Sequence, residues 1–283
     1  MAPLRPVAAR RGFPIPSPRR AADEEVSDAQ ARRVQEQFGA SAAAYVTSRL
    51  HAAGEDLDRL LAWGAARRPD RVLDVATGGG HTALAFAGVA RRVVAYDLTE
   101  PMLAAARGHV RARGAANVEF VAGDAGDLPF RDESFDVVTC RTAAHHFADV
   151  PAAVRQIHRI LRAGGSLLLQ DILGHDDADA NAFILEVEKR RDPSHVRSYR
   201  ATEWKAFLRA AGLTVMEDSV IWKLREWNEW TGRMRMTAEA RRALDDFVRR
   251  APERCRAAFQ FQLTPDAIVS FNDRQVLIRA DRD

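Results

Sequence analysis

The chain has 283 residues, and 47% of them are hydrophobic, which is enough for one large domain with a substantial core. It contains no run of about 18 apolar residues that could span a membrane, and its N-terminus lacks the apolar segment of a secretory signal. A formal net charge of +3 is weak evidence for nucleic-acid binding. We therefore expect a globular cytoplasmic protein without a nucleic-acid partner.

The two cysteines, Cys140 and Cys255, form neither a CxxC pair nor a metal-ligand spacing. We therefore expect reduced thiols and no metal site.

The N-terminal quarter predicts a tail followed by helices. Residues 1–20 contain five prolines, five arginines and no acid. This composition cannot bury enough apolar surface to order itself, so we expect a disordered basic tail over residues 1–26. From Ser27 to about Leu61, apolar residues recur at spacings of three and four, which is typical of helices. An N-terminal helical cap is expected over residues 27–68.

Between residues 69 and 175, short apolar runs alternate with helical stretches. The runs are VLDVA, RVVAYD, VEFVAG, FDVVTC and SLLLQD. This alternation predicts a parallel sheet, because parallel strands need a crossover connection between them.

Residues 176–283 predict two amphipathic helices, a strand near 213–220 and a tryptophan-rich helical region. The last apolar runs, 268–271 and 275–278, predict a hairpin that turns at Asn272 and Asp273. We expect this part to complete the fold with strands six and seven and to carry a helical lid over the substrate.

Three consecutive glycines, Gly78 to Gly80, separate the first apolar run from a helix. Glycine lets a ligand approach bare backbone, and a helix N-terminus favours an anionic group. Asp97 ends the second run, where a carboxylate can accept from ribose hydroxyls, and Asp124 follows the third. Each feature alone also fits a tight turn or a solvated acid. Together, at one edge of a sheet, they predict a nucleotide-type ligand site.

The runs VLDVATGGG, VVAYDLTEPML, FVAGDAGDLPF, FDVVTCRTAAHHF and ILRAGGSLLL resemble, in order and spacing, the motifs of class I S-adenosylmethionine-dependent methyltransferases. The resemblance covers roughly residues 34–171 and is to the ubiquinone/menaquinone-biosynthesis C-methyltransferase type. It implies an α/β, Rossmann-like fold with a mostly parallel seven-stranded sheet flanked by helices, and S-adenosylmethionine as cofactor. One departure is Ala76, which stands where the family has its first glycine.

The resemblance implies a role for each matching position. The Gly78–Gly80 turn would lie along the methionine part of the cofactor, and Asp74 would hold that turn or, through water, the amino group. Asp97 would bind the ribose. The remaining cofactor-binding positions are Leu98, Met102, Asp124 and Ala125 around the adenine and Arg141 at the methionine end, together with Ala76 in the turn. Core packing is the alternative for Met102.

Two histidines in TAAHHF, His145 and His146, are the catalytic candidates, because they follow the fourth strand at the edge where ligands bind. Adjacent residues of an extended turn point in opposite directions. We therefore expect His145 to face the acceptor and remove or orient a proton, with a satisfied histidine at the pocket rim as the alternative. We expect His146 to be bonded into the scaffold.

The acceptor is expected to be a small molecule, quinone-like or another secondary metabolite, methylated at carbon or oxygen. His195, Arg197 and Tyr199 are possible contacts, and the tryptophans after residue 200 could wall a pocket or form the lid's own core. An RNA or protein methyltransferase and a cofactor-binding cyclase or scaffold are the alternatives. We expect a monomer or a homodimer.

Overall fold

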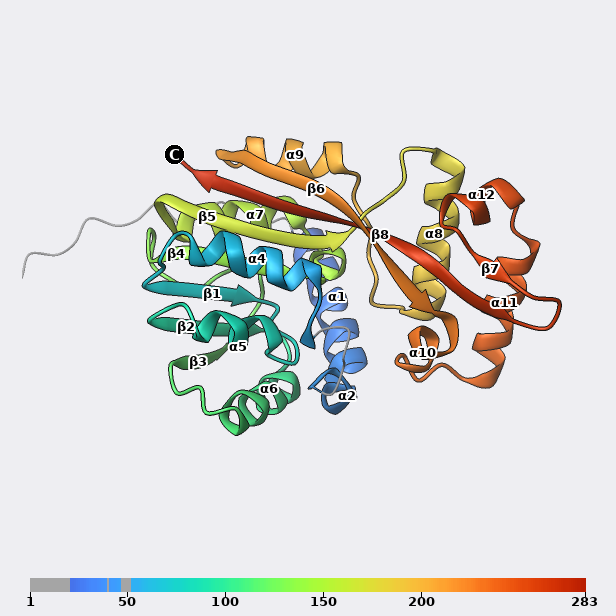
Figure 1. Ribbon diagram of the computed structural model, residues 1–283, viewed down its shortest axis with the longest axis horizontal. Coiled ribbons are helices and arrows are strands. Elements are labelled where there is room, and N and C mark those ends of the chain that lie inside the picture. The colour runs from blue at the N-terminus through green and yellow to red at the C-terminus, as the bar shows by residue number, and fades with distance from the viewer. Residues whose placement is uncertain (1–20, 40, 47–51) are drawn as a thin grey trace, which may run out of the picture.

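The computed structural model describes residues 21–39, 41–46 and 52–283 of the chain. It has two lobes, which are joined by two long strands that run through both (Figure 1). The larger lobe is a sheet with helices on its faces, and the smaller is mainly helical.

The sheet has the strand order β3-β2-β1-β4-β5-β8-β6. Its strands are β1 (Arg71–Val75), β2 (Arg92–Asp97), β3 (Val118–Ala122), β4 (Phe135–Arg141), β5 (Leu161–Ile172), β6 (Leu213–Glu226) and β8 (Ile268–Arg282), and the short β7 (Gln262–Leu263) pairs with β8. β1 to β5 are parallel, whereas β8 runs antiparallel to both β5 and β6. The mostly parallel, Rossmann-like α/β fold expected from the sequence is confirmed.

Helices connect the strands. They are α1 (Ala21–Gly39), α2 (Ala42–Val46), α4 (Glu55–Ala65), α5 (His81–Ala87), α6 (Glu100–Ala112), the 3₁₀ helix η1 (Ala144–His146), α7 (Val150–Ile160), α8 (Ala178–Arg191), α9 (Ala201–Ala210), α10 (Trp227–Gly232), α11 (Ala238–Arg250) and α12 (Glu253–Ala258). Local signals start several of them. For example, the Asp149 carboxylate accepts from the Ala152 N–H at the start of α7, and Pro151 occupies its first turn, where no N–H is needed.

Alternate residues of the buried strands pack on opposite faces of the sheet. Leu60 of α4 and Phe86 of α5 lie in one apolar cluster with Val72. Leu73, the next residue of β1, belongs to the cluster on the other face, with Ile157 of α7 and residues of α9. Because each strand of the sheet centre is covered on both sides, its sequence is a continuous apolar run.

The smaller lobe has its own apolar core. Trp227 and Trp230 pack there against Phe271 of β8, with ring centroids 5.9 and 4.8 Å apart, and residues of α8, α11 and α12 complete the cluster. We call the assembly of α8, α10, α11, α12, β7 and the adjoining ends of β6 and β8 the second lobe. Trp204 belongs to the main core, and Trp222 is exposed.

The expected hairpin at Asn272 and Asp273 is wrong. Both residues lie inside β8, where they pair with Leu224 and Lys223 of β6, and neither has the positive φ of a tight hairpin turn. The sequence run Asn-Asp is polar because the Asp273 carboxylate accepts from the buried guanidinium of Arg225. The short hairpin of this region instead joins β7 to β8.

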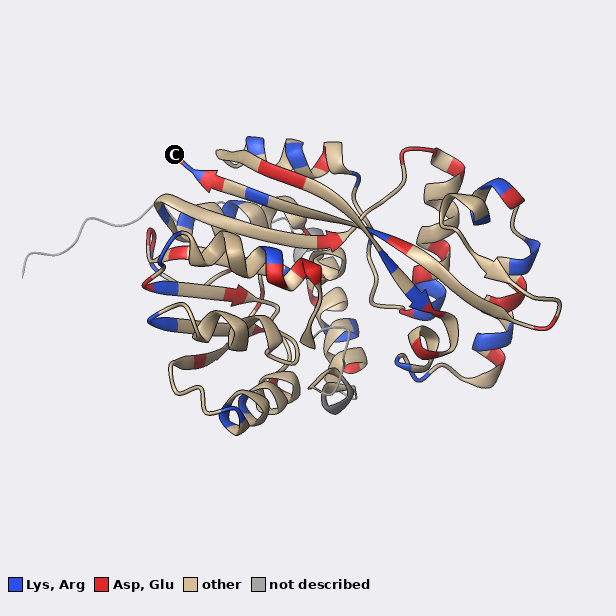
Figure 2. Ribbon diagram, viewed as in Figure 1, with Lys and Arg blue, Asp and Glu red and all other residues tan. Residues whose placement is uncertain are grey.

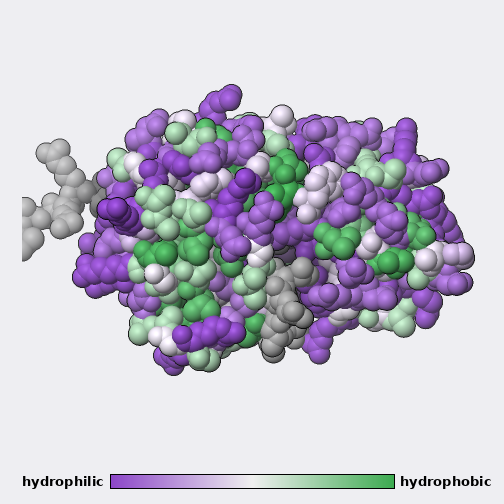
Figure 3. All heavy atoms as spheres, viewed as in Figure 1, coloured by the Kyte–Doolittle hydropathy of each residue, from purple (hydrophilic) through white to green (hydrophobic). Residues whose placement is uncertain are grey.

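Two further boundaries differ from expectation. α1 begins at Ala21, so residues 21–26, assigned to the tail, are helical, while residues 1–20 lie outside the described part. The segment from Ser27 to Leu61 is divided among α1, α2 and α4. Among the described residues no helix combines the length and apolar character needed to cross a bilayer. Figure 3 shows hydrophobic residues on this face as separated patches within a mainly hydrophilic surface.

Candidate active site

A cavity with about 940 Å³ of empty space, part of it open to solvent, lies at the carboxyl ends of the parallel strands and is covered by α1. We call it the larger cavity. Its wall on the sheet side is formed by Val75, Ala76, Gly78, Tyr96, Asp97, Leu98, Thr99, Met102, Gly123, Asp124, Ala125, Gly126, Thr142 and Ala143, and α1 contributes Ser27, Gln30, Ala31, Val34 and Phe38. Figure 2 shows acidic residues at the carboxyl ends of β1 and β5, which point toward the second lobe.

The three glycines of the turn differ in the space around the position where a Cβ would stand. Gly78, at φ +53°, has open space where a Cβ would stand, and it lines the larger cavity. A Cβ on Gly79 would lie 2.9 Å from the Tyr45 carbonyl oxygen, and one on Gly80 would lie 3.1 Å from the Ala106 Cβ. Only Gly78 therefore presents bare backbone to a ligand, whereas Gly79 and Gly80 permit close packing on α2 and α6. Ala76 lines the cavity at φ +54°, a conformation that favours glycine.

Asp74 lies beneath this turn and is fully enclosed by protein. Its two carboxylate oxygens accept from the hydroxyls of Thr139 and Thr77, each at 2.6 Å, and from the Ala83 N–H. Burial raises the pKa of Asp74 to about 6, although the two threonine hydroxyls act in the opposite direction. Since it does not line the cavity, Asp74 holds the turn rather than facing a ligand.

Asp97 and Asp124 both line the larger cavity, as do Leu98, Met102 and Ala125. The Asp97 carboxylate accepts from the Gly78 N–H and the Thr99 N–H, each at 2.9 Å, which ties the second strand to the glycine turn. Burial raises the pKa of Asp97. The Asp124 carboxylate accepts from the Gly126 N–H. Both carboxylates are thus positioned by backbone donors and keep further lone pairs for a ligand.

Arg141 does not line either cavity described here. Its guanidinium is buried against the Asp56 carboxylate of α4, with Nε and Oδ2 2.7 Å apart, and Lys223 of β6 binds the same carboxylate. Burial acts to raise the pKa of Asp56, but the cations Arg141 and Lys223 hold it below its usual value. This charge cluster joins α4, β4 and β6, and no local sequence signal marks Asp56 or Lys223 as its members.

A smaller, more polar cavity of about 550 Å³ adjoins the larger one between the two lobes. Four residues line both cavities, namely Phe38, Tyr45, Thr142 and His146. The smaller cavity is otherwise lined by His145, Ile172, Glu188, Arg191, Asp192, His195, Arg225, Trp230, Arg233 and Met234. The two cavities are therefore adjacent, and these four residues lie between them.

The two adjacent histidines are not arranged as expected. Residues 144–146 form a 3₁₀ helix rather than an extended turn, so the rings of His145 and His146 lie on neighbouring sides, with centroids 4.1 Å apart. His145 Nδ1 lies 2.5 Å from the Asp171 carboxylate, and this residue lines only the smaller of the two cavities. The premise of an extended turn with its two rings pointing in opposite directions is wrong.

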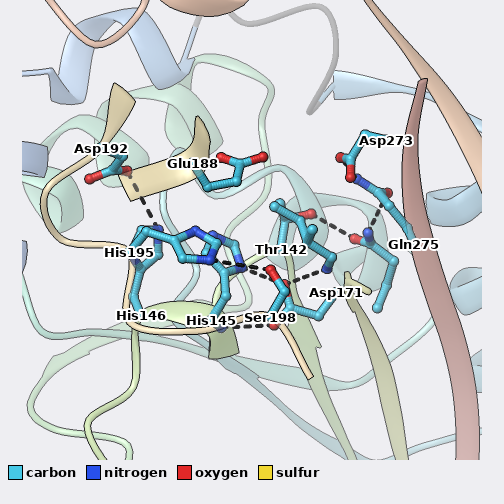
Figure 4. Close-up of polar contacts among 12 residues, drawn as sticks. Thr142, His145, His146, Asp171, Glu188, Asp192, His195, Ser198, Asp273 and Gln275 are labelled. Carbon is cyan, nitrogen blue, oxygen red and sulfur yellow. Dashed lines mark hydrogen bonds and ion pairs between the residues drawn. The ribbon is translucent and has the colours of Figure 1, made fainter. Parts of the chain in front are cut away.

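His146 is held from its other side. Its Nδ1 lies 3.1 Å from the Ser194 carbonyl oxygen and 3.2 Å from the Ser194 hydroxyl, which itself donates to Asp192. Because a carbonyl can only accept, the contact with Ser194 favours the neutral tautomer with its proton on Nδ1, and Nε2 lies 3.9 Å from the Asp192 carboxylate. Figure 4 shows the rings of His145, His146 and His195 grouped between Asp192 and Asp171.

Burial lowers the pKa of His145 and of His195 well below the usual range, so both rings are neutral near pH 7. His195 stacks on His145 with centroids 4.9 Å apart and lines the smaller cavity. Arg197 instead pairs with Glu203, and Tyr199 packs in the main core. Of the tryptophans, Trp230 lines the smaller cavity.

Sequence reasoning missed the part that α1 plays in the site. The Gln30 amide donates to the carbonyl oxygens of His146 and Ser194, at 3.0 and 2.6 Å, and so ties α1 to both cavities. A glutamine on an amphipathic helix carries no signal for such a contact. Among the described residues no group of three His, Cys, Asp or Glu side chains is arranged to hold a metal ion.

Comparison with known proteins identifies this architecture. Residues 73–169 match the family model of a methyltransferase domain. An uncharacterized methyltransferase of Bacillus subtilis, YcgJ, is 35% identical over 244 residues, which cover 86% of this chain and 96% of that protein. The solved structure of a Bacillus halodurans protein described as a methyltransferase superposes with a TM-score of 0.78 at 39% identity, over 81% of this chain and 99% of that one.

Similarity to the quinone-biosynthesis enzymes is confined to part of the chain. The ubiquinone/menaquinone biosynthesis C-methyltransferase UbiE of Dinoroseobacter shibae is 39% identical over 115 residues, which are 40% of this chain and 46% of that enzyme. The UbiE of Pseudomonas putida is 34% identical over 157 residues, which are 54% of this chain and 55% of that enzyme, so the resemblance to that type covers about half of this chain.

Proposed function

Because the chain belongs to the class I S-adenosylmethionine-dependent methyltransferases, we propose that it transfers a methyl group to carbon or oxygen of a small-molecule acceptor held in the smaller cavity. The observation that carries this proposal is that the two cavities adjoin at Phe38, Tyr45, Thr142 and His146, which line both. A cofactor along the glycine turn and an acceptor between the lobes would meet at these four residues.

The residues of the larger cavity fit the cofactor. The space over Gly78 admits a ligand against bare backbone, and a Cβ there would stand in the cavity. Asp97 would bind the ribose hydroxyls, and Asp124 with the Ala125 N–H would bind the adenine between Leu98 and Met102. Ala76 would lie along the methionine part with Gly78. The cofactor supplies an electrophilic methyl group on a sulfonium, so the protein's tasks are alignment and exclusion of water.

Arg141 and Asp74 enter this proposal as positioning residues. Arg141 connects β4 to α4 through Asp56, and Asp74 holds the glycine turn from below. Gly79 and Gly80 allow the close packing that places the turn. None of these four groups lines the larger cavity, so their effect on a ligand would pass through backbone position.

His146 is our candidate for acid or base work, since it lines both cavities and its ring is held between Ser194 and Asp192. His145 would act as a positioning residue. Its ring is anchored by Asp171, which also accepts from the backbone N–H of His145. This assignment reverses the one expected from an extended turn.

The acceptor class rests on the polar character of the smaller cavity and on its position between the two lobes. Residues from two lobes surround it, which suits a small molecule better than a polymer that must lie across an open surface. A quinone-like compound and other secondary metabolites both fall within this class.

The test begins with calorimetric titration of S-adenosylhomocysteine, followed by incubation with methyl-labelled cofactor and a small-molecule cell extract. The expected result is saturable cofactor binding and a labelled low-molecular-mass product. Label found in RNA or protein would contradict the proposed small-molecule acceptor and would make a macromolecule the acceptor. Cofactor binding without any labelled product would favour a cyclase or scaffold role over methyl transfer.

A further inference from the structure

We propose that the acceptor is a monoanionic aromatic or apolar carboxylate, whose acidic group binds Arg233 in the smaller cavity. This inference rests on the proposed function, because it names the substrate class of the same site. It is carried by the arrangement of charged groups around the cavity.

Arg233 is the cation of this cavity that lacks an acidic partner. It follows α10 and lines the smaller cavity. Among the described residues, no carboxylate lies within 4.0 Å of its guanidinium, and its Nε is buried without a hydrogen-bond acceptor. The terminal nitrogens of this guanidinium also have no hydrogen-bond or ion-pair partner among the described residues, and they are the donors left for a ligand oxygen.

The two other arginines are already engaged. Arg225 binds Asp273 through Nε and Nη2, at 3.3 and 2.8 Å from one carboxylate oxygen. Arg191 donates from Nε to the Trp230 carbonyl oxygen and stacks over the Trp230 ring at 4.3 Å. Each has a defined orientation imposed by protein groups, which leaves Arg233 as the arginine of this cavity without a hydrogen-bond or ion-pair partner among the described residues.

The acids around the cavity do not balance these three arginines. Asp192 and Asp273 supply two negative charges, and Asp192 is occupied by Ser194. Burial raises the pKa of Glu188 to about 8, even beside Arg191. An arginine without an acidic partner therefore remains in this cavity, and a monoanionic carboxylate would supply its counter-charge.

The remaining wall is apolar and partly aromatic. Phe38, Ile172, Trp230 and Met234 line the smaller cavity beside the arginines. Flat hydrophobic groups pack well against such side chains. A planar guanidinium binds a carboxylate through two parallel hydrogen bonds, so the combination selects an acid with an apolar body.

Calorimetry with a matched pair of probes, 2-naphthoate and 2-naphthamide, tests the inference in the presence of saturating S-adenosylhomocysteine. We expect the parent protein to bind the naphthoate at least tenfold more tightly than the amide. Arg233→Gln should weaken naphthoate binding at least tenfold and leave amide binding unchanged. Arg233→Lys, which keeps the charge, should retain a preference for the acid.

Arg235→Gln is the matched control, because Arg235 is an exposed arginine two residues further along and does not line the cavity. It should bind both probes like the parent. Equal binding of acid and amide by the parent, no binding of either, or an undiminished preference in Arg233→Gln would overturn the inference. A parent that binds naphthoate selectively but no S-adenosylhomocysteine would instead refute the proposed function and leave the anion site standing.

Discussion

At the carboxyl edge of β1, β2 and β3, polar side chains are held by the backbone of a neighbouring turn, whereas in the second lobe they are held by side chains from distant parts of the chain. Asp97 and Asp124 accept from backbone N–H groups. Arg225, by contrast, is oriented by Asp273, 48 residues away. The first arrangement is local and leaves a motif in the sequence, and the second is long-range and leaves none.

The two regions also have separate apolar cores. Trp204 belongs to the cluster of the sheet, and Trp227 to that of the second lobe. The smaller cavity lies where these cores end. Substitutions can therefore be chosen that act on one region and spare the other.

The largest effect is expected from His146→Ala, which should lower turnover by roughly 10²–10⁴ while cofactor affinity stays near the parental value. The reason is its position between the two cavities. Rates of label transfer to the identified acceptor measure it. His145→Ala is the comparison, and it should mainly lower the melting temperature because it leaves the buried Asp171 without its ring partner. If His145→Ala keeps its stability and loses turnover to the same extent, the two roles are assigned in reverse.

Trp227→Ala should destabilise the protein by about 3–5 kcal/mol, since a fully buried indole leaves a cavity in the second lobe. Denaturant unfolding measures this loss. Below the transition, S-adenosylhomocysteine should still bind, because the larger cavity contains no residue of that lobe. Trp222→Ala, at an exposed position, should change the stability by less than about 0.5 kcal/mol. Loss of cofactor binding in folded Trp227→Ala would show that the regions are not separable.

Asp97→Ala should weaken S-adenosylhomocysteine binding at least tenfold, because it removes the proposed ribose acceptor and the acceptor of the Gly78 N–H together. Asp97→Asn should lose less, since an amide oxygen can still accept. Asp132→Ala, at a largely exposed carboxylate, serves as the control. Calorimetric affinities that are equal for parent and Asp97→Ala would remove Asp97 from the site.

The smallest effect concerns pH. Burial raises the pKa of Glu188 from its ordinary 4.5 to about 8 in the folded protein, so the folded state holds a proton that the unfolded state releases. The parent should therefore lose stability as pH rises from about 5 to 8. Glu188→Gln has no such proton, and its melting temperature should rise relative to the parent over this window. A constant difference between the two across that range would contradict the raised pKa.

The contrast between the regions also explains what the sequence could predict. The five parallel strands, the glycine turn and the acids that follow the second and third strands were all predictable, because apolar runs, glycine conformation and strand ends are local properties. The continuity of β8 through Asn272 and Asp273 was not, since a polar pair reads as a turn unless its partner Arg225 is known. The direction of the two histidine rings depended on a 3₁₀ turn set by Asp171 and Ser194.

Charged pairs between distant parts of the chain could not be predicted from the sequence either. Arg141 follows a strand at the expected edge, yet its guanidinium binds Asp56 on a helix 85 residues earlier. The unpaired Nε of Arg233 can be recognised only when every acid around it has been assigned a partner. Local patterns thus predict the cofactor side of the site, and three-dimensional pairing is needed for the acceptor side.

The long pairing of β6 with β8 has a mechanical consequence. The ladder runs from Leu213 opposite Arg282 to Glu226 opposite Ser270, with one irregularity between Val215 and Glu217, and it crosses from one lobe to the other (Figure 1). Rotation about one or two bonds of either strand would break its hydrogen bonds with the other strand. A change in the angle between the lobes must therefore be spread along the ribbon as twist, whereas α1, which lines the larger cavity, is not part of the ribbon and is tied to His146 and Ser194 by the Gln30 side chain.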